Sequence, residues 1–149
     1  MVDLVGDAKP FFQEKIRRVC GREGVDADSR FLELEYLSDV LTRHVNPARA
    51  YRDGGALDRV VDLLVREIEA VLSELDAYQA AADKILFYQG IFPEVFRRKR
   101  MNINFYAAVG RRFYGVVGAH RESPLFRRLA DDYPTWRFIL SGVREEIVV

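Results

Sequence analysis

The chain has 149 residues, 49% of them hydrophobic, which is enough to bury one core and is a common size for a single domain. Its 23 basic and 23 acidic side chains balance, so no overall electrostatic field draws it toward nucleic acid or an anionic membrane. One cysteine, Cys20, excludes a disulfide framework, and the absence of a signal-peptide layout or a long apolar run leads us to expect a cytosolic protein.

The charge is unevenly distributed along the chain. Residues 1–90 hold 12 basic and 17 acidic side chains, whereas residues 91–128 hold nine basic and two acidic ones. The second stretch therefore carries a net charge of +7. We expect any anionic partner to bind there.

Apolar residues recur at helical spacing with no sustained two-residue alternation, so we expect an all-α fold. A first helix is predicted over about 8–20, with Asp7 as its N-cap and Gly21 at its end. A second helix over about 29–44 turns an apolar stripe toward the core. Its acidic side chains are predicted to face solvent: Glu33, Glu35 and Asp39.

Residues 57–89 lack glycine and proline, and their apolar positions alternate steps of four and three, which predicts one long central helix. Three flanking positions are apolar where a two-stranded coiled coil carries charges: Val65, Leu72 and Leu86. This favours a helix surrounded by neighbours in a bundle, with a homodimer as the alternative. A break near Ser73 or Asp76, either of which could cap a new helix, also remains open.

Proline, glycine and capping residues divide the second half of the chain. The expected helix starts are marked by Pro93, by Asn102 or Asn104, by the Ser123–Pro124 pair and by Pro134. The expected helix ends are Gly90 and Gly118. We therefore predict a single helical domain over residues 1–149, with six or seven helices around the long one.

The sequence carries no recognisable catalytic or metal-binding pattern. His44 and His120 lack the preceding glutamate of a di-iron bundle, and both fall near predicted helix C-termini. No nucleophile elbow or phosphate-binding glycine loop occurs. Cys20 has three arginines within helical reach, which favours a thiolate, but its apolar stripe favours a buried, inert thiol. We expect no catalytic residue, no metal and no cofactor.

The candidate binding residues are the arginines and the lysine of the basic block: Arg97, Arg98, Lys99, Arg100, Arg111 and Arg112. The first four end a short helix and precede the N-terminus of the next one, where free N–H groups favour anions. They could bind a phosphate or carboxylate, or simply form a solvated basic edge. Sequence-specific nucleic-acid binding is disfavoured, because the chain is neutral and no helix-turn-helix is evident.

The helix expected from residue 102 has two unusual faces. Its aromatic residues, Phe105 among them, are predicted to form a stripe that faces the core. On another side Ala108 and Gly115 lie between Arg111 and Arg112, which leaves a strip of nearly bare backbone with cationic edges. Either another helix of the same chain packs on this strip, or the strip is a groove for an acidic partner helix or an anionic ligand.

Two segments, "ILFYQGIFPEVFRR" and "NFYAAVGRRFYG", together resemble a pattern of uncharacterised all-helical bacterial proteins. The pattern is Gly-aromatic-Phe-Pro-Glu, a pair of arginines, and then aromatic pairs around Gly-Arg. The resemblance covers about 30 residues directly. It implies a helical domain and transfers neither an activity nor a catalytic residue.

Taken together, these features predict a non-enzymatic, cytosolic protein-interaction or regulatory module. Its basic surface would receive a protein partner with an acidic surface. The alternative is a binder of a small molecule or anion, or an enzyme, with an aromatic-lined pocket in the C-terminal half of the chain.

Overall fold

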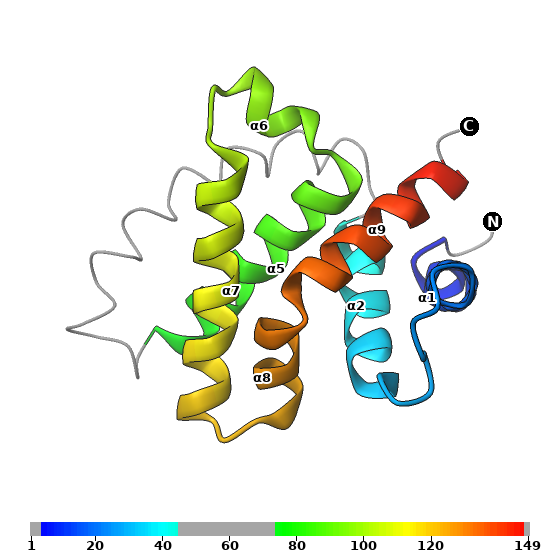
Figure 1. Cartoon of the computed structure of the whole chain (residues 1–149), viewed down its shortest axis with the longest axis horizontal. Coiled ribbons are helices and arrows are strands. Elements are labelled where there is room, and N and C mark those ends of the chain that lie inside the picture. Colours follow the sequence, from blue (N-terminus) through cyan, green and yellow to red (C-terminus); the bar gives the residue numbers. More distant parts are fainter. Residues whose placement is uncertain (1–3, 45–73, 148–149) are drawn as a thin grey trace.

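The computed structural model describes residues 4–44 and 74–147, with the side chains of 4–7 left out, and within these ranges it contains helices and no strands. The seven described helices are α1 (Leu4–Arg22), α2 (Phe31–His44), α5 (Leu75–Ile91), α6 (Glu94–Arg98), α7 (Ile103–His120), α8 (Pro124–Asp131) and α9 (Tyr133–Ile147) (Figure 1). The all-α prediction is confirmed.

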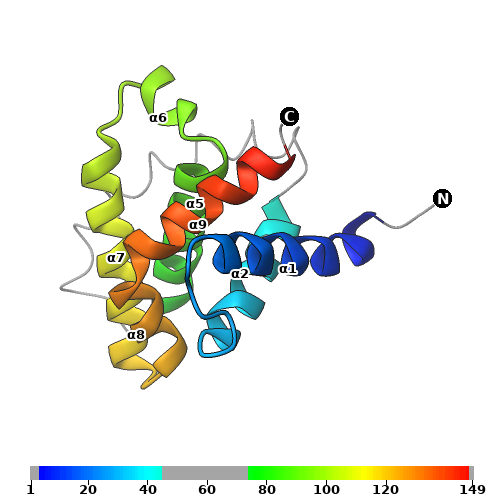
Figure 2. The ribbon, with the colours of Figure 1, turned by 45° about the vertical axis from the view of Figure 1, so that its right-hand side comes forward.

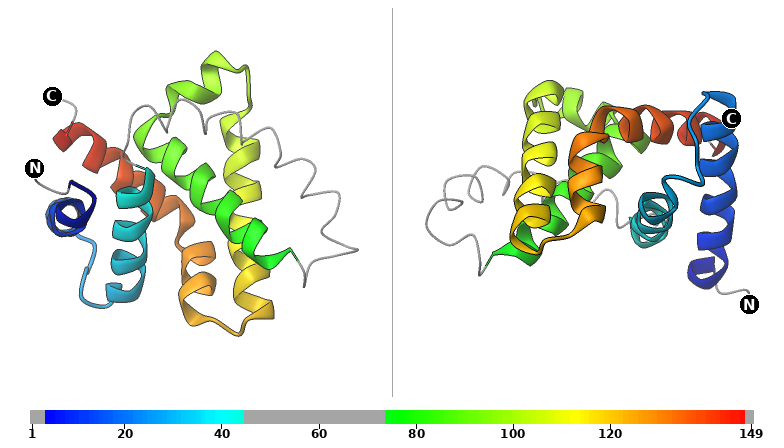
Figure 3. Two further views of the ribbon diagram at one scale, coloured as in Figure 1. Left: turned by 180° about the vertical axis from the view of Figure 1, so that it is seen from behind. Right: turned by 60° about the horizontal axis from the view of Figure 1, so that its bottom comes forward.

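The helices form two groups joined by α9. Helices α5, α7 and α8 pack together at one end, while α1 packs on α2 at the other. Helix α9 packs on both α5 and α1, and Figures 2 and 3 show it running from the α7–α8 end toward α1. All these helices share one core, in which Trp136 is the largest fully buried side chain.

Helix α5 is buried on nearly all sides over its last two turns, from Ile85 to Ile91. Leu86, one of the flanking apolar positions, is fully buried, as a bundle requires. A single helix over 57–89 is not confirmed: Glu74 adopts a non-helical backbone conformation before α5 begins at Leu75, and residues 57–73 lie outside the described ranges.

Two helices begin at the capping side chains that the sequence predicts. The Asn102 side chain accepts hydrogen bonds from two backbone N–H groups at the start of α7, and Ser123 caps α8 with Pro124 in its first turn. Pro134 lies in the first turn of α9, which restarts after α8 ends at Asp131. Asp7, by contrast, lies inside α1 and is not its cap.

Two predicted helix ends were wrong, because a glycine can also lie inside a helix. Helix α1 passes Gly21 and ends before Gly24, which has the left-handed φ of 72°. Helix α7 passes Gly118, where an added Cβ would lie 2.7 Å from the backbone nitrogen of Arg127 in α8. Gly118 therefore lets α7 and α8 approach each other.

Candidate functional site

The turn between α6 and α7 is built by the backbone of the basic block. Arg100 adopts a left-handed φ of 55°, and its N–H donates to the carbonyl oxygen of Arg97 at 3.1 Å. The Met101 N–H donates to the carbonyl oxygen of Phe96 at 2.7 Å. This pair of hydrogen bonds closes the C-terminus of a helix and brings the two apolar side chains, Met101 and Phe96, to the same side of the turn.

A groove of about 760 Å³, here called the first groove, lies where this turn meets the C-terminal half of α9. It is lined by Pro93, Glu94, Phe96, Arg97, Met101, Ile103 and Arg144. Arg144 donates to the Glu94 carboxylate at 2.8 Å, which ties α9 to α6 beside the groove. The groove thus combines an apolar surface with one ion pair and the guanidinium group of Arg97.

The four basic residues of the turn do not all line the first groove. All four side chains are exposed, but only Arg97 lines the first groove. Arg98, Lys99 and Arg100 lie outside its lining. The Arg97 guanidinium forms no ion pair or hydrogen bond with another residue in the described ranges, so its charge is available to a ligand.

Arg111 and Arg112 line a separate, second groove of about 340 Å³ between α7 and the start of α9. Its other lining residues are Ala107, Ala108, Tyr133 and Pro134. The bare strip predicted on this helix is partly covered by the same chain, since Tyr133 and Pro134 share the lining with Ala108, and an added Cβ on Gly115 would lie 3.8 Å from the Ala130 Cβ of α8. Ala108 and both arginines remain exposed.

The predicted aromatic stripe on α7 is only partly correct. Tyr106, Phe113 and Tyr114 are buried, but Phe105 is 46% exposed. The aromatic side chains mainly contact one another, as Tyr78 and Phe113 do with ring centroids 4.8 Å apart. Each groove has a single aromatic side chain in its lining, so neither matches an aromatic-lined pocket.

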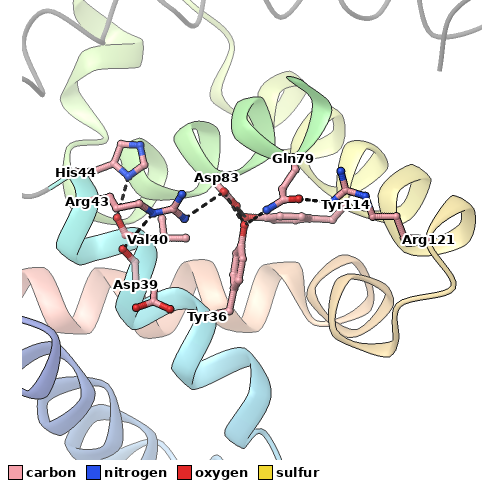
Figure 4. A network of polar contacts seen from close by, with 9 residues as sticks. All are labelled: Tyr36, Asp39, Val40, Arg43, His44, Gln79, Asp83, Tyr114 and Arg121. Carbon is pink, nitrogen blue, oxygen red and sulfur yellow. Dashed lines mark hydrogen bonds and ion pairs between the residues drawn. The ribbon is translucent and has the colours of Figure 1, made fainter. Parts of the chain in front are cut away.

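A buried polar network, shown in Figure 4, centres on Asp83 of α5. The Tyr36 hydroxyl of α2 donates to both Asp83 carboxylate oxygens, at 2.6 and 2.8 Å, and the Tyr114 hydroxyl of α7 donates to one of them at 2.7 Å. The Arg43 guanidinium lies 3.6 Å from the other oxygen. Burial nevertheless raises the pKa of Asp83 to about 6, against the lowering effect of these donors.

This network continues to the surface through Gln79. The Gln79 amide donates to the Tyr36 hydroxyl oxygen at 2.9 Å, and its carbonyl oxygen accepts from Arg121 at 2.5 Å. Arg121 also pairs with the exposed Asp76 carboxylate. The network thereby connects α2, α5 and α7, and none of its residues lines either groove.

A second buried link lies beneath the grooves. The Gln89 side chain of α5 donates to the backbone carbonyl oxygen of Ile103 in α7 at 2.9 Å. Its own carbonyl oxygen accepts from the Tyr133 hydroxyl of α9 at 2.7 Å. Gln89 therefore fixes the start of α7 relative to the start of α9.

Glu33 contradicts the prediction of a solvated acidic face on α2. Its side chain is fully buried, neither carboxylate oxygen has a hydrogen-bond partner in the described residues, and Arg128 of α8 lies 3.8 Å away. Burial raises the pKa of Glu33. The prediction failed because α8 covers this side of α2. Glu35 and Asp39 do lie nearer the surface, where both pair with Lys9.

The remaining chemical candidates do not form a reactive site. Burial raises the pKa of the Cys20 thiol, which opposes a thiolate in spite of the nearby arginines. His44 and His120 are the last residues of α2 and α7, as predicted. The described ranges hold no group of three or more potential metal-ligating His, Cys, Asp or Glu side chains. No described helix combines the length and apolar character needed to span a membrane.

Sequence reasoning missed the network of Asp83 and the hydrogen bonds of Gln89, because which polar side chains meet depends on how separate helices pack. No family model matches the chain, and neither the curated proteins nor the solved structures searched contain a match.

Proposed function

We propose that the protein is a cytosolic, non-enzymatic interaction module that receives an acidic segment of a partner protein at the first groove. One observation carries the proposal: Arg97, unpaired among the described residues, lines a groove of about 760 Å³ whose other lining is largely apolar. A partner segment with both a carboxylate and an apolar side chain matches this surface. The carboxylate can make bidentate hydrogen bonds to the guanidinium group.

The surrounding charge favours the same kind of partner. Residues 91–128 carry a net charge of +7, and Arg98, Lys99 and Arg100 lie exposed in the turn beside the groove. Their field speeds the approach of an acidic segment without requiring a fixed contact from each side chain.

The test is a titration of the full chain with two labelled peptides, one alternating Asp and Leu and one alternating Lys and Leu. We expect binding of the acidic peptide alone, and a loss of affinity in Arg97→Glu. Arg127→Glu is the matched control, because Arg127 is an exposed arginine on α8, near the opposite end of α7. Equal binding of both peptides, or an equal loss in both variants, would contradict the proposal.

A second candidate function is the binding of a small anionic molecule. The volume of the first groove falls within the range of small-molecule sites, and it contains few polar groups, as such sites do. Titration with inorganic phosphate separates the two candidates. Phosphate binding that depends on Arg97, without binding of the acidic peptide, would favour the small-molecule function.

A further inference from the structure

The first and second grooves are lined by the same stripe of α7. Ile103 lines the first groove, while Ala107 and Arg111 line the second. Residues four apart on a helix lie on one face, separated by about 6 Å along the axis. The two grooves therefore follow each other along α7 over about 12 Å.

One stripe of α9 likewise lines both grooves. Tyr133 lines the second groove and Arg144 lines the first. Arg137, four residues after Tyr133, lies on the same stripe between them, and its charge acts on the Tyr133 hydroxyl. The Arg137 guanidinium has no ion pair or hydrogen bond within the described residues. This stripe of α9 thus carries two arginines, Arg137 and Arg144, the second of which is paired with Glu94.

The stripe of α7 is open at its N-terminal half because α8 and α9 cover only the rest. Near the other end of α7, Gly118 meets the backbone of α8, and in the middle Gly110 meets Tyr133. Beyond that contact α7 and α9 diverge, with α6 at the wide end (Figures 1 and 2). The Gln89 side chain bridges the two helices beneath this gap.

We propose that the two grooves form one channel, walled by α7 and α9, that binds an extended acidic segment of a partner protein. The proposal rests on the proposed function and adds the second groove to it. Carboxylates of the segment pair with Arg97 at one end and Arg111 at the other, with Arg137 between them. Apolar side chains of the segment enter the first groove against Met101 and Ile103.

The spacing of the two grooves suits an extended segment. An extended segment advances about 3.3 Å per residue, so side chains four residues apart span about 13 Å. That spacing matches the length of α7 that lines the two grooves.

The lining also favours a peptide over a nucleic-acid strand. Single-stranded nucleic acids bind by stacking their bases on exposed aromatic rings. The aromatic side chains in the lining, Phe96 and Tyr133, are only 1% and 2% exposed and present no ring face. The aliphatic surface between the arginines suits leucine-like side chains instead.

Two heptapeptides of equal length test the channel by NMR titration of the full chain. The first alternates Asp and Leu throughout, whereas the second has Asp-Leu-Asp followed by Gly and Ser. We expect the first to bind about three- to tenfold more tightly, since it gains one or two exposed charge pairs. We also expect Arg111→Glu to remove this advantage without changing the affinity for the second peptide.

A steric variant gives an independent readout. Ala107→Trp places a large side chain in the second groove, at its side nearer the first groove, and should abolish the affinity advantage of the first peptide. Arg127→Glu should preserve that advantage. Should Ala107→Trp fail to fold, Arg111→Glu on the exposed surface still decides the question.

The outcomes separate the two proposals. Equal affinity for both peptides, with dependence on Arg97 retained, overturns the channel and leaves the proposed function standing. No dependence on Arg97 overturns both. Tighter binding of an oligouridine strand than of the first peptide, or dimerisation that blocks peptide binding, also overturns the channel.

Discussion

Asp83 offers a direct test of the buried network, because burial and hydrogen bonding oppose each other at its carboxyl group. Burial raises its pKa from 3.8 to about 6. An acid whose pKa is higher in the folded state holds its proton more tightly there, so it contributes stability below about pH 4. That contribution is lost as the pH rises to about 6. At about 1.4 kcal/mol per pH unit, the loss amounts to about 3 kcal/mol.

The perturbation is Asp83→Asn, which keeps the shape of the side chain and removes the titration. Urea unfolding of both proteins at pH 4 and pH 7 gives the difference in their free energies of unfolding at each pH. We expect this difference to shift by about 2.4 kcal/mol in favour of the asparagine variant between pH 4 and pH 7, whatever its absolute size, because part of the loss has already occurred in the unfolded chain at pH 4. Comparing differences cancels the titration of all other carboxyl groups.

The matched control is Asp131→Asn, which changes an exposed carboxylate on α8. It measures how far an exposed Asp→Asn change alone alters the free energy of unfolding at the two pH values. A pH dependence of Asp83→Asn no larger than that of this control would refute the reasoning. It would mean that Tyr36, Tyr114 and Arg43 stabilise the carboxylate enough to offset its burial.

Three further predictions concern stability and use urea unfolding at pH 7. Gly118→Ala should lower the free energy of unfolding by about 2 kcal/mol, because the new Cβ would lie 2.7 Å from a backbone nitrogen of α8. Gly21→Ala should instead raise it by about 0.5–1 kcal/mol, because nothing lies within 4 Å of the new Cβ. Equal effects of the two substitutions would contradict this account. Arg100→Gly should stabilise by about 1 kcal/mol, because glycine adopts the φ of 55° without strain, and a loss would show that the arginine side chain matters to the fold. Glu33→Gln should stabilise by about 1 kcal/mol by removing a buried charge without hydrogen bonds, whereas a loss would show that its ion pair dominates.

The sequence predicted those features of the fold that depend on neighbouring residues alone. Asn102 and Ser123 are such cases, since a capping side chain bonds to N–H groups two or three residues away. Pro134 similarly marks the restart of α9 by a local restriction of the backbone. Gly21 and Gly118 were misjudged because a glycine that ends a helix and a glycine inside a helix look the same in sequence. Of the two, only Gly118 admits a close neighbour.

Features that depend on tertiary packing were not predictable in the same way. In the heptad register of the predicted long helix, Asp83 occupies a position that faces away from the seam, yet α2 and α7 bury it. Glu33 fails for the same reason, since α8 covers it. At the candidate site, the exposure of all six basic residues agreed with expectation. Only Arg97 lines the first groove, and only Arg111 and Arg112 line the second. This depends on where α9 packs against the rest of the fold, which a helical wheel of one helix does not show.

The walls of the proposed channel are held in place before any partner arrives. Gln89 hydrogen-bonds to both walls, and an added Cβ on Gly90 would lie 2.4 Å from Leu140, so α5 and α9 are in close contact. A partner segment therefore does not have to order the helices, and the main ordering cost falls on the exposed arginines and on the segment itself. Because that cost is modest per side chain, a few charge pairs and one apolar contact suffice for transient binding. We accordingly expect the affinity to decrease with salt, since its electrostatic part is exposed to solvent.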